Sequence, residues 1–146
     1  MKNYLIIGGS SGIGEALVKI LAEENNLYVT YKENQFNDIG TVRFQYYDVE
    51  DDKPLVDLPD ALHGIVYLPG TINLRPFHRI KPTQFSKDYQ VNLVGAVKAI
   101  QQVLPNLKKA GNAAIVLFST VAVQTGMGFH SIVASSKGAI EGLTKA

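Results

Sequence analysis

Residues 4–17, YLIIGGSSGIGEAL, decide the fold, because a short apolar run passes through a glycine-rich turn directly into a helical pattern. A continuous apolar run such as 4–7 is typical of a strand that is buried on both faces of a parallel sheet. Gly8 permits a tight bend off that strand, Gly12 lets the backbone approach a pyrophosphate, and Gly14 allows the helix to pack closely on the sheet. This order of strand, turn and helix predicts a dinucleotide-binding site.

The turn also supplies hydrogen-bond donors for phosphate groups. The start of a helix offers free N–H groups and the positive end of the helix dipole, and Ser10 and Ser11 add hydroxyl groups just before Ile13. Many glycine-rich turns are ordinary bends, but the strand and the helix on either side favour nucleotide binding here. The residues that we expect to contact the dinucleotide from this turn are Gly8, Ser10, Ser11, Gly12, Ile13 and Gly14.

The rest of the chain alternates between apolar segments and helical patterns. The predicted strands are Tyr4–Ile7, Leu27–Tyr31, Val42–Tyr47, Gly64–Leu68 and Ala113–Phe118, and the predicted helices are Ile13–Glu24, Gln84–Lys109 and Phe129–Ala146. This alternation predicts an α/β fold, a Rossmann-type doubly wound parallel sheet with strand order 3-2-1-4-5. Residues 32–41, KENQFNDIGT, are too few for a crossover helix and predict a loop or a single helical turn.

Length and composition restrict the class of protein. The 146 residues, 46% hydrophobic and 18% charged, predict a single dinucleotide-binding domain over 1–146, and the uncapped helical pattern at Ala146 predicts that the domain continues beyond it. A net charge of +1 without a basic stripe argues against a nucleic acid partner. The chain has no cysteine and three histidines without a common ligand spacing, so we expect no metal site. No apolar stretch approaches about 18 residues, so we expect no membrane contact and a cytoplasmic location.

The end of the second predicted strand bears on the choice of coenzyme. An acidic residue there binds the ribose 2′-hydroxyl of NAD, whereas a basic residue accommodates the 2′-phosphate of NADP. The chain has Lys32 at this point and no acidic residue before Glu33. Lys32 therefore favours NADP, with NAD as the alternative, although a solvated surface lysine would also explain it.

Three polar residues extend the pattern of the glycine turn, namely Asn92, Ser119 and Lys137. With them, the chain resembles the short-chain dehydrogenase/reductase family over its whole length, as a divergent member. The matching segments are GGSSGIG at 8–14, DVED at 48–51, VNLVGA at 91–96, VLFSTVA at 116–122 and SSKGAIEGLTKA at 135–146. The resemblance implies an NAD(P)-dependent oxidoreductase that moves a hydride between the nicotinamide and a carbonyl or alcohol carbon of a small molecule.

The resemblance also implies further coenzyme contacts. The spaced glycine triplet of the family matches the three glycines named above, with Gly9 at a position where variation is common. Asp48 and Val49 match the family's acidic position near the adenine. Gly70 retains the last residue of the family's Asn-Asn-Ala-Gly turn, whereas the preceding residues here are Tyr67-Leu68-Pro69.

The chemistry of the family uses an Asn, a Ser, a Tyr and a Lys. The resemblance assigns Asn92 to hold a water in a proton relay and Ser119 to polarise the substrate carbonyl. Lys137 then matches the lysine that binds the nicotinamide ribose and lowers the pKa of the Tyr. The Tyr position is four residues earlier, where this chain has Val133. Valine cannot donate a proton, and general acid–base help is typically worth about 100- to 10,000-fold.

Another group would have to replace that tyrosine. His130 is the first candidate, because it lies seven residues before Lys137 and an unperturbed histidine pKa of about 6.5 suits proton transfer; the alternative is that it only opens the helix. Tyr67, at the end of a strand, and a water are further candidates, whereas Ser131 lies on another helix face. Glu141, four residues after Lys137, would alternatively form an i,i+4 salt bridge with it.

Other functions and contacts remain open. Val133 favours a nucleotide-binding protein without turnover, a sensor or a scaffold subunit, as the alternative function. A Ser–Lys hydrolase built on Ser119 and Lys137 lacks the Gly-x-Ser-x-Gly elbow. The apolar stripe between Leu93 and Leu107 predicts core and subunit contacts rather than a ligand groove, and the resemblance implies a homodimer or a homotetramer.

Overall fold

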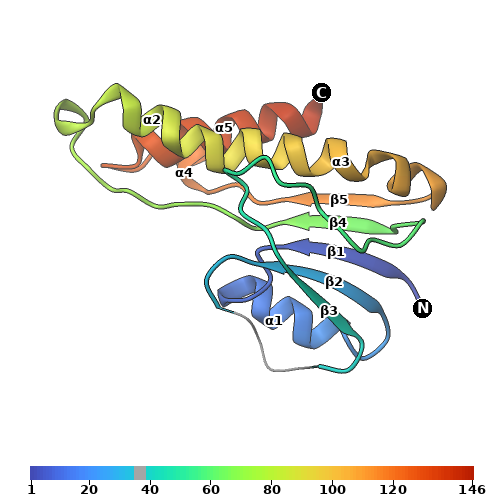
Figure 1. Ribbon diagram of the computed structural model, residues 1–146. Coiled ribbons are helices and arrows are strands. Elements are labelled where there is room, and N and C mark those ends of the chain that lie inside the picture. Colours follow the sequence, from blue (N-terminus) through green and yellow to red (C-terminus); the bar gives the residue numbers. More distant parts are fainter. Residues whose placement is uncertain (35–38) are drawn as a thin grey trace.

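The computed structural model describes residues 1–34 and 39–146 and contains one parallel sheet with helices on both faces (Figure 1). The strands are β1 (Asn3–Ile7), β2 (Asn26–Tyr31), β3 (Val42–Tyr46), β4 (Gly64–Tyr67) and β5 (Ala114–Leu117). Their order is β3-β2-β1-β4-β5, with every pair parallel. The predicted fold class and strand order are therefore confirmed, and each predicted strand ends within one residue of the observed one.

The helices include the three that the sequence predicts. They are α1 (Gly12–Leu21), η1 (Phe77–Arg79), α2 (Pro82–Tyr89), η2 (Gln90–Val94), α3 (Gly95–Lys109), α4 (Ala122–Thr125) and α5 (Ser131–Lys145). The predicted helix over 84–109 corresponds to the continuous run of α2, η2 and α3, in which η2 is a π-helical turn. The sequence did not predict η1 and α4, because three or four residues are too few to show a helical period.

The core divides into two layers, one on each face of the sheet. Ile6 packs with Val18 of α1, whereas Leu5 and Ile7 pack on the opposite face with the residues of α3 and α5. Figure 1 shows this division, with α1 on one side of the sheet and α3 and α5 on the other. Because side chains alternate across a strand, a strand covered on both faces must be apolar throughout, and Leu5, Ile6 and Ile7 are each 0% exposed.

Two predictions of burial are wrong in detail. Ile115 and Val116 of β5 are 46% and 43% exposed, because β5 ends the sheet and pairs with β4 alone within 1–34 and 39–146. The stripe predicted on α3 includes Leu104, which is 39% exposed, while small residues such as Ala96 and Ala99 are fully buried. Their size lets the helix approach the sheet closely, and periodicity of large apolar residues does not reveal this.

The predicted loop or turn at 32–41 lies partly outside the described residues, which omit 35–38. The flanking residues 32–34 and 39–41 form neither helix nor strand. Among the helices of the described residues, none combines the length and the apolar character that crossing a membrane requires.

Candidate coenzyme and catalytic site

The glycine turn has the geometry that its sequence predicts. Gly8 and Gly12 have φ of +78° and +54°, a region that glycine adopts without strain. A Cβ on Gly14 would lie 2.5 Å from the carbonyl oxygen of Gly8, so α1 can pack on the turn only without a side chain there. The buried hydroxyl of Thr30 in β2 accepts the Gly8 N–H at 3.0 Å and fixes the turn against the sheet.

Gly9 has a role that sequence reasoning missed. A Cβ at this position would lie 2.4 Å from Cγ1 of Val29 and 3.1 Å from Cγ2 of Ile6. The turn can therefore lie on β2 only with glycine here. The sequence carries no signal for this contact, because Val29 is twenty residues away and becomes a neighbour only when β2 pairs with β1.

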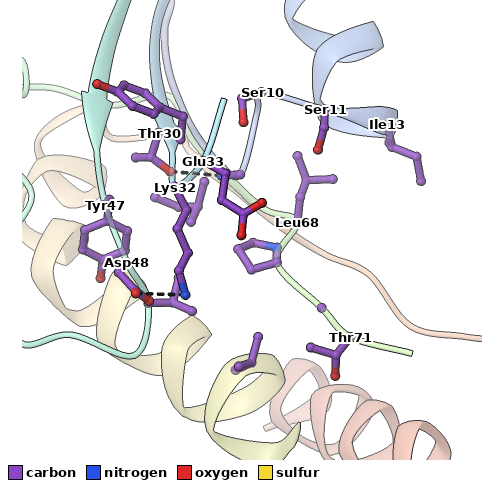
Figure 2. A pocket seen from close by; sticks show the side chains of 18 of the residues that line it. Ser10, Ser11, Ile13, Thr30, Lys32, Glu33, Tyr47, Asp48, Leu68 and Thr71 are labelled. Atoms are coloured by element: carbon purple, nitrogen blue, oxygen red, sulfur yellow. Dashed lines mark hydrogen bonds and ion pairs between the residues drawn. The ribbon is translucent and has the colours of Figure 1, made fainter. Parts of the chain in front are cut away.

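A cavity of about 640 Å³ opens at the carboxyl ends of the strands (Figure 2). Ligand sites of this fold class lie at that edge, and the volume is in the range of small-molecule sites. The predicted site residues that line it are Gly8, Ser10, Ser11, Ile13, Gly14, Lys32, Asp48, Val49, Gly70 and Ser119. Gly12 lies in the turn between two of these, and a Cβ there would meet nothing within 4 Å.

Lys32 lies in the cavity wall and is paired. Its Nζ is 2.9 Å from Oδ2 of Asp48 (Figure 2). The same Nζ is 3.7 Å from Oε2 of Glu50. The hydrogen bond to Asp48 raises the pKa of Lys32. The Glu50 N–H and the Lys32 ammonium in turn lower the pKa of Asp48. The predicted 2′-phosphate residue and the predicted adenine residue thus neutralise each other at one end of the cavity.

Gly70 lines the cavity, and Asn92 and Lys137 lie directly beside Gly70 without lining the cavity themselves; these three residues are called the inner site below. A Cβ on Gly70 would lie 3.1 Å from Oδ1 of Asn92 and 3.4 Å from Nζ of Lys137. Asn92 is fully buried in η2, where its Nδ2 donates to the Asp88 carbonyl at 3.0 Å, and its Oδ1 has no hydrogen-bond partner among the described residues. An unpaired buried acceptor is costly, so this oxygen fits a water or a ligand donor.

Lys137 is half-buried beside that oxygen. Desolvation lowers its pKa, and the negative charge of Asp88 opposes that shift. The alternative salt bridge with Glu141 is wrong, because Glu141 Oε1 accepts the Ser119 hydroxyl at 2.6 Å and no carboxylate of the described residues lies within 4.0 Å of Nζ. Because the Ser119 hydroxyl donates to Glu141, it does not form the Ser–Lys pair with Lys137 that a hydrolase would need.

The sequence model of the short chain dehydrogenase family matches residues 2–146. The chain belongs to the short-chain dehydrogenase family. Among curated relatives of this family, 3-ketodihydrosphingosine reductase of Bacteroides thetaiotaomicron is 24% identical over 97% of this chain and 55% of its own length. L-xylulose reductase of Bos taurus is 29% identical over 99% of this chain and 63% of its own length. The chain thus spans less than two thirds of these relatives.

Solved structures of short-chain dehydrogenases have the same fold. One from Saccharomyces cerevisiae superposes with a TM-score of 0.87 at 21% identity, over 98% of this chain and 63% of that one. A mutant of a Serratia marcescens short-chain dehydrogenase/reductase superposes with a TM-score of 0.80 at 25% identity, over 99% of this chain and 68% of that one.

Val133, which the sequence analysis matched to the family tyrosine, is buried in α5 and 6% exposed. Of the candidate replacements, Tyr67 is wrong. Its hydroxyl donates to the Val91 carbonyl at 2.5 Å inside the core, where a Cβ on Gly95 would lie 2.3 Å from it. Burial raises the pKa of Tyr67 well above its usual value, so this phenol is not available for proton transfer to a ligand.

His130 lies immediately before α5. Its Nδ1 is 2.6 Å from the carbonyl oxygen of Gly128, and its own carbonyl accepts the Ala134 N–H at 2.8 Å. Both contacts are those of a residue that opens a helix, which was the alternative explanation of this histidine. Whether His130 also reaches a bound substrate stays a prediction.

Proposed function

We propose that the protein binds a nicotinamide dinucleotide in the cavity and transfers a hydride between the nicotinamide and a carbonyl or alcohol carbon. The observation that carries this proposal is that the glycine turn and Gly70 line one cavity, and that Asn92 and Lys137 lie directly beside Gly70. The unpaired Oδ1 of Asn92 and the empty space beside Gly12 fit the proposed occupant.

The residues would divide the coenzyme between them. The free N–H groups at the start of α1, with Ser10 and Ser11, would hold the diphosphate. Asp48 and Val49 would contact the adenine, and the Lys137 ammonium would bind the nicotinamide ribose. When bound, the coenzyme supplies or accepts the hydride.

Ser119 would orient the reacting carbonyl by donating its hydroxyl proton. In the described structure that proton is directed to Glu141 Oε1 at 2.6 Å. A substrate carbonyl must therefore compete with a carboxylate for the same proton. A carboxylate is a stronger hydrogen-bond acceptor than a neutral carbonyl. The substrate oxygen therefore competes best with Glu141 for the Ser119 hydroxyl when it carries negative charge, as a carbonyl oxygen does during reduction.

The proton for that oxygen must come from a group other than the residue at 133. We propose a water held by Asn92 Oδ1 beside the Lys137 ammonium as the donor, with His130 as the alternative. Desolvation lowers the pKa of Lys137, and a lower pKa makes its ammonium group a better source of protons for this water.

NADP is the proposed coenzyme, with NAD as the alternative. The support is Lys32, whose ammonium group stands at the end of β2. A 2′-phosphate would have to draw Lys32 away from Asp48 and Glu50. The gain in affinity for NADP would therefore be the free energy of the new Lys32–phosphate ion pair minus that of the ion pairs that Lys32 gives up. The homo-oligomer and the cytoplasmic location that the sequence predicts stay predictions.

The test is coenzyme binding followed by turnover. We expect the full-length protein to enhance NADPH fluorescence on binding and to oxidise NADPH with members of a panel of aldehydes and ketones. Binding without oxidation of NADPH by any of them would favour the sensor or scaffold function. Absence of binding to both NADPH and NADH would contradict the proposal.

A further inference from the structure

Asp88 is a buried acid that the proposed chemistry does not use. It lies near the end of α2, is 4% exposed, and receives hydroxyl hydrogen bonds on both carboxylate oxygens. Thr71 donates to Oδ1, and Ser136 donates to Oδ2 at 2.6 Å. A carboxylate that accepts on both oxygens is in the arrangement of its ionised form.

The partners of Asp88 are sequence neighbours of the inner site. Thr71 follows Gly70 and lines the cavity (Figure 2), and Ser136 precedes Lys137 in α5. The backbone carbonyl of Asp88 accepts the Nδ2 hydrogen bond of Asn92. Asp88 therefore joins the three elements that carry the inner site, which are the loop after β4, η2 and α5.

The hydroxyl contacts leave the charge of Asp88 uncompensated. Hydroxyl groups satisfy hydrogen bonds without supplying positive charge, and a buried charge is costly unless an opposite one is near. Lys137 is in the complementary situation, because it is half-buried and has no carboxylate within 4.0 Å among the described residues. Asp88 is the charged group whose field acts on Lys137 in the described chain.

We propose that Asp88 is the counter-charge of Lys137 and the positioning residue of the inner site. Its charge keeps the Lys137 ammonium protonated although that group is desolvated. Its two hydroxyl contacts hold the loop and the helix that bring Gly70 and Lys137 together. The benefit for coenzyme binding rests on the proposed function, whereas the coupling of the two charges belongs to the folded protein by itself.

The test is an NMR titration of the Lys137 Nζ, assigned by its disappearance in Lys137→Arg and measured on the full-length protein without coenzyme. Asp88→Asn keeps the shape of the side chain and removes its charge, so the ammonium loses a favourable interaction. We expect the Lys137 titration midpoint to move to lower pH in this variant. Thr71→Val and Ser136→Ala are the matched controls, because each removes one hydroxyl contact and keeps the charge; both should leave the midpoint close to that of the wild type.

A reciprocal measurement covers the case in which Asp88→Asn does not fold. Lys137→Met keeps the length of the side chain and removes its charge, so the Asp88 carboxyl should become easier to protonate and its titration midpoint should rise. Unmoved midpoints in these charge-removing variants, or an equal shift in the hydroxyl controls, would overturn the inference. Because no coenzyme is present, that result would leave the proposed function standing, whereas absent NADPH and NADH binding would contradict the function alone.

Discussion

The ammonium group of Lys32 lies 2.9 Å from Oδ2 of Asp48, across the end of the cavity that would receive the adenosine ribose. The lysine is half-exposed and the aspartate is mostly covered. The residue that we propose for the 2′-phosphate is thus already paired with the residue that we propose for the adenine. Under the proposed binding mode, the preference between NADP and NAD depends on whether Lys32 pairs with Asp48 or with a 2′-phosphate.

Lys32→Asp should shift the preference from NADP toward NAD. The change replaces a phosphate-binding cation by an acid that accepts hydrogen bonds from the 2′-hydroxyl, and a charged hydrogen bond contributes about 1.5–3 kcal/mol, or about tenfold or more in affinity. Fluorescence titration with NADPH and NADH measures the ratio. Lys53→Ala is the control, since Lys53 is also an exposed lysine near an acid, Asp51 at 3.9 Å, but does not line the cavity. An unchanged ratio of NADPH to NADH affinity in Lys32→Asp would show that Lys32 is a surface charge without a role in coenzyme choice.

Alanine at the glycines of the turn should destabilise the protein by different amounts. Gly9→Ala and Gly14→Ala place a Cβ 2.4 Å and 2.5 Å from fixed neighbours, and such overpacking costs about 1–3 kcal/mol. Gly12→Ala meets no neighbour but must adopt a φ of +54°, at a cost of about 1–2 kcal/mol. Urea unfolding measures the free energy in each case.

Gly142→Ala is the control for this series. Gly142 lies in α5 with open space around its Cβ position, so alanine should stabilise the protein by about 0.5–1 kcal/mol through helix propensity. Equal effects at all four positions would show that the turn is not under the steric constraints described above.

Val133→Tyr should raise carbonyl reduction. It introduces a hydroxyl four residues before Lys137, on the same face of α5, and a positioned proton donor is typically worth about 100-fold or more. Val133→Phe adds nearly the same bulk without the hydroxyl and separates proton donation from repacking of this buried position. Steady-state NADPH oxidation gives kcat for both variants. Equal kcat values for Val133→Tyr and the wild type would show that the wild-type proton donor already performs this step.

His130→Ala should keep reductase activity, because the histidine ring contacts Gly128 and the proposed donor is the water beside Asn92. The expected change is less than about threefold, far below the effect of losing general acid catalysis. Single-turnover reduction at pH 6 and pH 8 measures it. A loss of activity of about 100-fold or more at both pH values would assign the proton to His130 instead.

Thermal unfolding provides a second reading of His130→Ala. The residue opens α5 through its carbonyl contact to the Ala134 N–H, a backbone interaction that alanine retains. We therefore expect a small change in Tm. A large decrease would mean that the ring contact with Gly128 holds the preceding loop, and the kinetic result would then need a second substitution for its interpretation.

The elements near the start of the chain were predictable because their signals are local. Buried strands of a parallel sheet must be apolar on both faces, so β1 and β2 stand out as continuous runs. The roles of Gly8 and Gly14 followed from backbone rules that apply to the turn itself. The predicted strand order already placed β5 at the edge of the sheet, but the exposure of Ile115 and Val116 was not predictable, since apolar residues look the same in the sequence whether or not another element covers them.

The sequence by itself determined the Rossmann-type order of elements, the glycine turn and the absence of a tyrosine four residues before Lys137, because each depends on residue type and spacing along the chain. Only the tertiary structure decided which side chains that are distant in the sequence interact with one another. It directed Ser119 to Glu141, enclosed Tyr67 in the core, required glycine at position 9 and put Asp88 behind the inner site. These contacts join residues 20 to 48 positions apart, and their energies depend on distances that exist only after the strands have paired and the helices have packed.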